Sequence, residues 1–189
     1  MKIAMKSILV LLVAATVTAF TNTTVKKINV SESTITWKGK KIVGNGHQGT
    51  INLKSGHLEM DGNTLTGGEF VVDMTSINVT DLEGKGKGRL EGHLKSDDFF
   101  GVTNYPEAKL VITSATKGDK SYKVNADLTV KGKTQAVSFN LDMGNSEARA
   151  ILEFDRSKHD VRYGSGSFFD DLGDKAISDN ILLDVLLKF

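Results

Sequence analysis

The stretch Tyr122–Val130, YKVNADLTV, has the residue pattern that decides the fold of this chain. Every second residue from Tyr122 to Val130 is apolar, and the residues between them are polar. Successive side chains of a β-strand point to opposite faces. The alternation therefore predicts a strand with one apolar face and one face in water.

The same alternation recurs on both sides of this stretch. It is clear in residues 137–141 and 148–154, although Ile151 falls out of phase. The segment 181–189 is more continuously apolar, which predicts a strand covered on both faces. Shorter segments of the same kind lie upstream, at residues 34–38, 50–53, 69–74 and 108–113.

Short turn signals separate these segments and predict antiparallel neighbours. The signals are residues 54–56, 61–63, 117–119, 131–133 and 144–146. The sequence therefore predicts an all-β fold of about eight or nine strands. Such a sheet can close into a barrel or fold as a sandwich with a packed centre, and alternation alone leaves both open.

Residues 80–100 lack strand alternation. Asp81 can cap a helix, and Leu90 and Leu94 are four residues apart. We expect one or two short helices here, interrupted by the four glycines between residues 84 and 92.

The first 19 residues predict a secretory signal peptide. Lys2 and Lys6 precede an uncharged, mostly apolar stretch at 7–19 that ends in Val-Thr-Ala. Thirteen residues are short for a membrane span, which takes about 20. We expect one mature domain at 20–189, located in the periplasm or secreted, with no stable membrane anchor.

The composition narrows the chemistry. The chain has no Cys, which excludes disulfides, Cys-ligated zinc, thiol catalysis and an acylated N-terminal Cys. Its formal net charge is +1 with no long basic run, so we expect no nucleic-acid partner. The four histidines have no metal-ligand spacing, and Ser165 lacks the spacing of a nucleophile elbow. We therefore predict no catalytic set and no metal site.

Seven segments, in order, resemble the YceI-like family of exported lipid-binding proteins over nearly the whole mature chain. The most telling is residues 93–100, HLKSDDFF, followed by Tyr105-Pro106. The others are residues 33–39, 46–51, 67–77, 127–134, 155–156 and 162–170.

The resemblance implies a lipocalin-like, extended antiparallel β-barrel. It also implies non-catalytic binding or carriage of a long amphiphilic lipid, polyisoprenoid or quinone-like, in an apolar tunnel. Beyond that bound lipid, no cofactor is implied. Burial of the lipid chain would contribute about 0.8 kcal/mol per CH₂ group.

Three polar residues are candidates for the head group of the lipid, and alternation predicts which residues face the tunnel. His47, His93 and Arg156 are candidates for binding the head group, and an arginine suits a phosphate because its fork makes paired hydrogen bonds. For Arg156, a structural pair with a carboxylate is the alternative. The predicted wall residues are Ile35, Trp37, Ile51, Leu53, Phe70, Val72, Leu110, Ile112, Leu128, Val130, Phe139 and Leu141.

Two other functions stay open at this point. One is an enzyme on the same barrel with His47 or His93 as a base, although the sequence identifies no partner for either ring. The other is a structural or adhesive β-sandwich with a solid core.

Overall fold

The computed structural model describes residues 23–189, so the predicted signal peptide at 1–19 lies outside the described residues. The helical elements are α1 (Gly84–Lys95) and two 3₁₀ turns, η1 (Arg156–His159) and η2 (Gly173–Lys175). The strands are β1 (Thr23–Lys27), β2 (Thr34–Lys40), β3 (Gly46–Asp61), β4 (Thr64–Val79), β5 (Glu107–Lys117), β6 (Tyr122–Val130), β7 (Lys133–Met143), β8 (Glu147–Asp155) and β9 (Asn180–Lys188).

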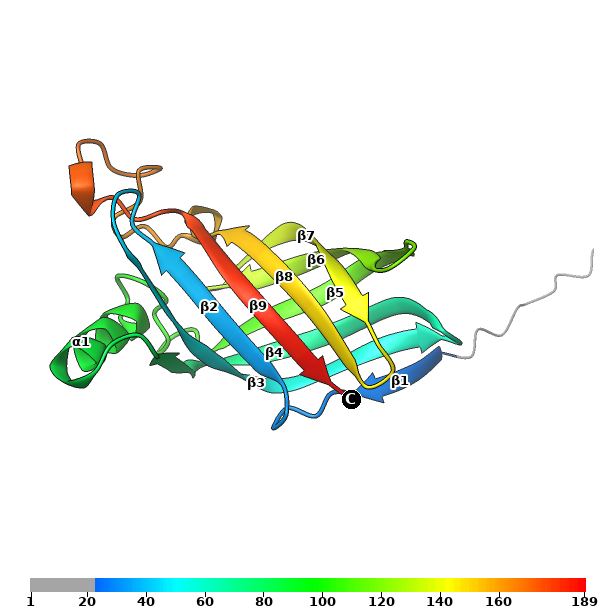
Figure 1. The fold of residues 1–189 in the computed structure, drawn as a ribbon. Coiled ribbons are helices and arrows are strands. Elements are labelled where there is room, and N and C mark those ends of the chain that lie inside the picture. Colours follow the sequence, from blue (N-terminus) through cyan, green and yellow to red (C-terminus); the bar gives the residue numbers. More distant parts are fainter. Residues whose placement is uncertain (1–22) are drawn as a thin grey trace, which may run out of the picture.

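Eight of these strands, β2 to β9, form a closed antiparallel barrel (Figure 1). The hydrogen-bonded order is β3-β2-β9-β8-β7-β6-β5-β4, and a further pairing of β3 with β4 closes the ring. β1 adds to the outer edge of β3, where Thr23 lies opposite Asp61. The predicted antiparallel barrel is confirmed, and the solid sandwich is excluded.

β3 and β4 are longer than the sequence predicted, with 16 residues each. The turn expected at 54–56 is wrong, because β3 continues through these residues. The β3–β4 register shifts between Leu53 and Ser55, as at a β-bulge. A bulge adds one residue to a strand and breaks its period of two, which imitates a turn in the sequence.

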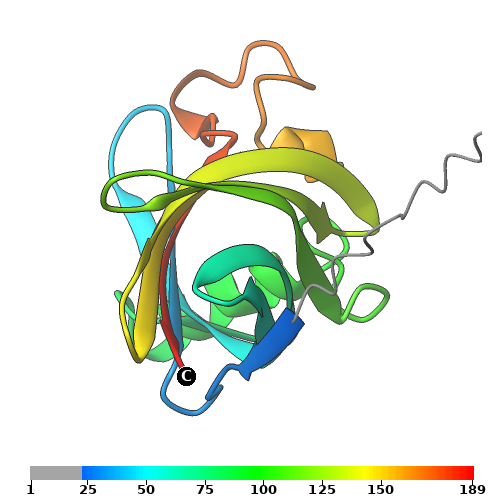
Figure 2. The same cartoon turned by 90° about the vertical axis from the view of Figure 1, so that its right-hand side faces the viewer.

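The segment around residues 80–100 holds one α-helix. The expected interruption is wrong, since α1 runs unbroken from Gly84 through Gly92. Asp81 does not cap it: the N-cap is Glu83, which makes no side-chain hydrogen bond there. Figures 1 and 2 together show α1 across one end of the barrel, in line with its interior. No helix in residues 23–189 is long and apolar enough to span a bilayer.

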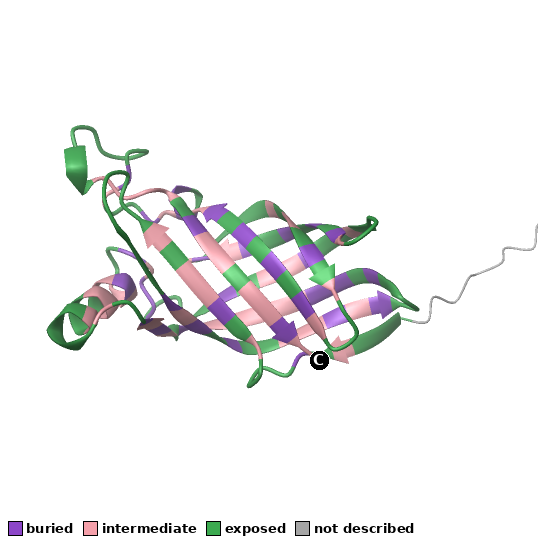
Figure 3. Ribbon diagram, in the orientation of Figure 1, coloured by how far each residue is buried: buried purple, intermediate pink, exposed green. Residues whose placement is uncertain are grey.

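Burial alternates along the strands, as the banding in Figure 3 shows. In β6 every second residue from Tyr122 to Val130 is buried, as predicted. In β9 the outward-facing Leu182 and Leu186 are half-buried, so this strand is partly covered on both faces.

The end of the barrel away from α1 is filled by side chains. Leu58 and Leu65, near the β3–β4 turn, are fully buried, and Tyr122 beside them is buried as well. The Tyr122 hydroxyl donates to the carbonyl oxygen of Asn63 at 2.9 Å. This packing fixes the hairpin tip against β6 and restricts free space to the rest of the interior.

Candidate functional site

An apolar cavity occupies the interior of the barrel. Its wall includes side chains from all eight barrel strands and from α1, and it is apolar apart from Lys109, Arg156 and Ser178. The cavity volume is about 180 Å³, more than ten times the roughly 10–15 Å³ that a cavity needs to hold one water.

The inward-facing side chains show that this space is open. In a packed core, residues on the inner face of a barrel would lose nearly all exposure. Here seven wall residues keep an intermediate exposure although they point inward, so they face free volume. They are Trp37, Phe70, Val72, Leu110, Phe139, Leu183 and Val185.

All twelve residues that alternation assigned to the tunnel wall line this cavity. Their contact with a ligand stays a prediction. Strands β8 and β9 contribute further wall residues that were not predicted, such as Leu152 and Val185, although the alternation at 148–154 was the available signal. Phe99 also lines the cavity and was not predicted, because it follows α1, where no period indicates a direction.

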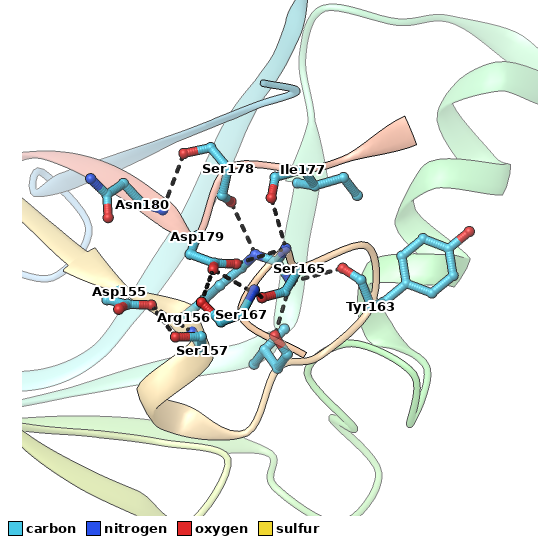
Figure 4. A network of polar contacts seen from close by, with 11 residues as sticks. Asp155, Arg156, Ser157, Tyr163, Ser165, Ser167, Ile177, Ser178, Asp179 and Asn180 are labelled. Atoms are coloured by element: carbon cyan, nitrogen blue, oxygen red, sulfur yellow. Dashed lines mark hydrogen bonds and ion pairs between the residues drawn. The ribbon is translucent and has the colours of Figure 1, made fainter. Parts of the chain in front are cut away.

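Arg156 lies where β8 ends and is fully buried (Figure 4). Its Nη1 donates to the carbonyl oxygens of Val161 and Tyr163, both at 2.9 Å. Nε donates to Ser178 O at 3.1 Å and Nη2 to Ile177 O at 3.2 Å.

The remaining partner of Arg156 is Asp179, whose Oδ1 lies 3.2 Å from Nη2. Burial lowers the pKa of Arg156, and the charges of Asp179 and Asp155 oppose that shift. Four of the five N–H groups thus donate to main-chain carbonyls, and Asp179 Oδ1, which accepts no hydrogen bond within the described residues, lies close enough for an ion pair. The geometry is that of the structural pair with a carboxylate.

His93 lies on α1 and does not itself line the cavity, although Leu94 and Phe99 beside it do. Its ring is 4.3 Å from that of Tyr163 and 5.7 Å from that of Phe99, between centroids. Its Nε2 is buried and has no hydrogen-bond partner within residues 23–189. Arg156 packs on the same Phe99, with Cζ 5.2 Å from the ring centroid. Two head-group candidates therefore flank Phe99, a residue of the cavity wall.

His47 lies apart from this pair. Its Nδ1 is 3.0 Å from Oδ2 of Asp81, and its side chain is 44% exposed. Burial raises the pKa of Asp81, but hydrogen bonds from His47 and the Gln48 N–H outweigh it and lower that pKa overall. His47 thus has the carboxylate partner that the sequence did not identify, but it does not line the cavity.

The described part of the chain holds no group of three or more His, Asp or Glu side chains placed to bind a metal ion. The absence of a metal requirement stays a prediction, tested below.

A family model described as the YceI-like domain matches residues 27–189. Among curated proteins, a UPF0312 protein of Photorhabdus laumondii is 32% identical over 99 residues, which is 49% of this chain and 50% of that protein. Protein YceI of Shigella flexneri is 35% identical over 63 residues, 33% of this chain and 32% of its own length. The chain spans half or less of the length of these two relatives.

Solved structures share the fold. BcnA of Burkholderia cenocepacia superposes with a TM-score of 0.67 at 19% identity, covering 85% of this chain and 98% of that one. A polyisoprenoid binding domain from Saccharophagus degradans, implicated in plant cell wall breakdown, gives 0.60 at 15% identity, with 85% and 95% covered. At these identities the likeness concerns the fold.

Proposed function

Because the chain belongs to the YceI-like domain family, we propose that it binds a long isoprenoid lipid, a polyprenol or an isoprenoid quinone, with the lipid chain in the barrel cavity. One observation carries the proposal: seven inward-facing side chains of the wall keep exposed surface inside a closed barrel. A barrel that only had to be stable would fill this space.

The wall chemistry suits a hydrocarbon chain and little else. Burial contributes about 0.8 kcal/mol per CH₂, or roughly 3–4 kcal/mol for one five-carbon isoprene unit. Association and ordering cost about 4–15 kcal/mol. A few buried isoprene units outweigh that cost. Because burial is not directional, the cavity should discriminate only weakly between lipids of different length.

The polar end of the lipid is proposed to lie near Phe99. His93 supports this position, since its Nε2 is buried without a partner and can bond a hydroxyl or a quinone carbonyl. Arg156 beside it is fully buried, with four N–H groups bound to main-chain carbonyls and its charge paired with Asp179. An uncharged head group therefore fits the described arrangement better than a phosphate.

The name of the Saccharophagus degradans domain, a polyisoprenoid binding domain of similar fold, supports this ligand class. We propose binding without catalysis, because the His47–Asp81 pair lies outside the cavity wall. The predicted leader supports a location in the periplasm or outside the cell, where such a protein would carry lipid through water.

Trp37 offers the direct test. It is the one tryptophan of the chain, and it lines the cavity. Titration of delipidated protein with a long-chain isoprenoid quinone should quench its emission saturably at a one-to-one ratio. The same quinone ring without its isoprenoid tail should quench only weakly and without saturation.

Equal, saturable quenching by the tailless ring would contradict a chain-binding cavity. Addition of EDTA should leave the titration unchanged, and loss of binding in EDTA would overturn the prediction that no metal is needed.

A further inference from the structure

Two loops at one end of the barrel carry an unusual share of its exposed apolar side chains. Five of the nine exposed large hydrophobic residues of the described chain lie on the β2–β3 loop and the segment between η1 and β9, namely Ile42, Val43, Tyr163, Phe168 and Phe169. We call Ile42, Val43, Phe168 and Phe169 the rim residues. Figure 1 shows both loops projecting beyond the same end of the barrel.

The β2–β3 loop presents the most exposed of these residues. Ile42 is 66% exposed and Val43 is 59% exposed. Lys40 and Lys41 precede them, both exposed, and residues 38–47 contain three lysines and no acidic residue. Aliphatic side chains behind a pair of lysines are typical of segments that lie in the interface of an anionic bilayer.

The second loop is tied to the first by main-chain hydrogen bonds. The Ile42 N–H donates to Ala176 O at 2.9 Å, and the Ser178 N–H donates to Lys40 O at 2.9 Å. Phe168 and Phe169 also lie on this second loop, and they are 40% and 50% exposed. Arg162 lies over the Phe168 ring at 5.0 Å.

Arg156 holds the two ends of the second loop together. This side chain binds the carbonyl oxygens of Val161, Tyr163, Ile177 and Ser178, on either side of the second loop. A buried guanidinium with five internal partners keeps the loop ends together while the tips extend into solvent.

The loops also continue the cavity wall. Gly39, Ile177 and Ser178 line the cavity, and the next residues along the chain from Gly39 are Lys40, Lys41 and Ile42. The cavity wall is therefore continuous along the chain with both exposed loops. This continuity is the reason to expect a bilayer rather than a protein at the rim.

We propose that the rim residues, with Lys40 and Lys41, dock the barrel on the surface of an anionic lipid bilayer, at the end where its cavity takes up lipid. The inference rests on the proposed function, because it supplies the source of the bound lipid. Asp170 and Asp171 follow Phe169 directly. The second loop therefore contacts the surface less deeply than the β2–β3 loop.

The test is flotation of purified protein with vesicles of phosphatidylcholine alone and with added phosphatidylglycerol. The chain should float with the anionic vesicles. Ile42→Ser should weaken this binding about tenfold, since it removes one buried aliphatic side chain. The double variant Lys40→Glu, Lys41→Glu should weaken binding to anionic vesicles more than twentyfold, because each lysine contributes roughly fivefold. Its binding to neutral vesicles should not change.

Ile151→Ser is the matched control, because Ile151 on the outer wall of β8 is 64% exposed. It should bind vesicles as the unmodified chain does. No vesicle binding by the unmodified chain, or an equal loss in Ile151→Ser, would overturn the inference. A change in oligomeric state caused by Ile42→Ser would also overturn it, in favour of a protein contact.

Quinone quenching of Trp37 separates this inference from the proposed function. Ile42→Ser should quench like the unmodified chain. Normal quenching without vesicle binding would remove the docking surface and leave the lipid-binding cavity standing.

Discussion

The indole ring of Trp37 lies over Gly49, its partner on the neighbouring strand, and Nε1 donates to Thr50 O at 3.2 Å. A Cβ at Gly49 would lie 2.6 Å from Cζ2 of that ring and would collide with the carbonyl oxygen of Asn78. Glycine at this position therefore lets the only tryptophan of the chain lie flat on the cavity wall.

Gly49→Ala should destabilise the barrel by about 1–3 kcal/mol, the usual cost of overpacking. The ring would also have to move, so the emission of Trp37 should shift. Urea denaturation with Trp37 emission measures both effects. Gly39→Ala is the control, because a Cβ there meets nothing within 4 Å. Equal stability of the two variants would show that the contact does not constrain the ring.

Arg156→Met should be among the most damaging single substitutions in the chain. It removes four hydrogen bonds to main-chain carbonyls and leaves Asp179 without its cation, and breaking a buried ion pair typically costs about 3–5 kcal/mol. Arg156→Lys should recover little of this, because one ammonium cannot reach the same partners.

Arg162→Met provides the comparison. Its side chain is 60% exposed, and its ion pair with Asp160 should be worth less than about 1 kcal/mol. If Arg156→Met were nearly as stable as the unmodified chain, the arginine would not be needed for stability. Ligand binding would then be the remaining reason for a buried arginine.

Helix α1 is intrinsically weak and can be strengthened without new contacts. A Cβ at Gly88 meets nothing within 4 Å, and its φ is not in the left-handed region. Gly88→Ala should therefore stabilise the protein by about 0.4–1 kcal/mol. Gly84 has a φ of 53°, so Gly84→Ala should have the opposite sign. Thermal denaturation of the two variants checks the predicted difference.

Glu147 makes stability depend on pH. The hydrogen bond from Lys188, followed by that from Arg149, lowers its pKa from the ordinary value of 4.5. The folded state thus favours the ionised carboxylate. This stabilising contribution is complete above the pKa that Glu147 has in the unfolded chain. It is lost as the pH falls toward the lower pKa that Glu147 has in the folded state.

Glu147→Gln should therefore lose less of its thermal stability than the unmodified chain between about pH 6 and about pH 3. An identical acid-induced fall in Tm for both proteins would contradict this assignment.

Local alternation was enough to predict the strands around Tyr122–Val130 and the direction of all twelve wall residues. It was not enough for β3, where the bulge near Ser55 breaks the period, or for Asp81, whose partner His47 is 34 residues away. Arg156 shows the same limit, because four of its partners are main-chain carbonyls that only the folded loops bring together.

Alternation also cannot distinguish a packed inward residue from one that faces free space. Leu128 has the clearest pattern in the sequence and lines the cavity, yet only 5% of its surface is exposed. Leu110, opposite it on β5, has intermediate exposure and faces the cavity. Leu110 is therefore the better position from which to fill the space.

Mass spectrometry of an organic extract tests the central claim most directly. Protein purified without detergent from its own compartment should yield an isoprenoid lipid in near-stoichiometric amount. Leu110→Trp should yield far less, since the larger ring occupies the cavity, whereas Val111→Trp on the outer face should match the unmodified chain. An extract without lipid, or equal lipid in Leu110→Trp and the unmodified chain, would contradict a lipid-binding cavity.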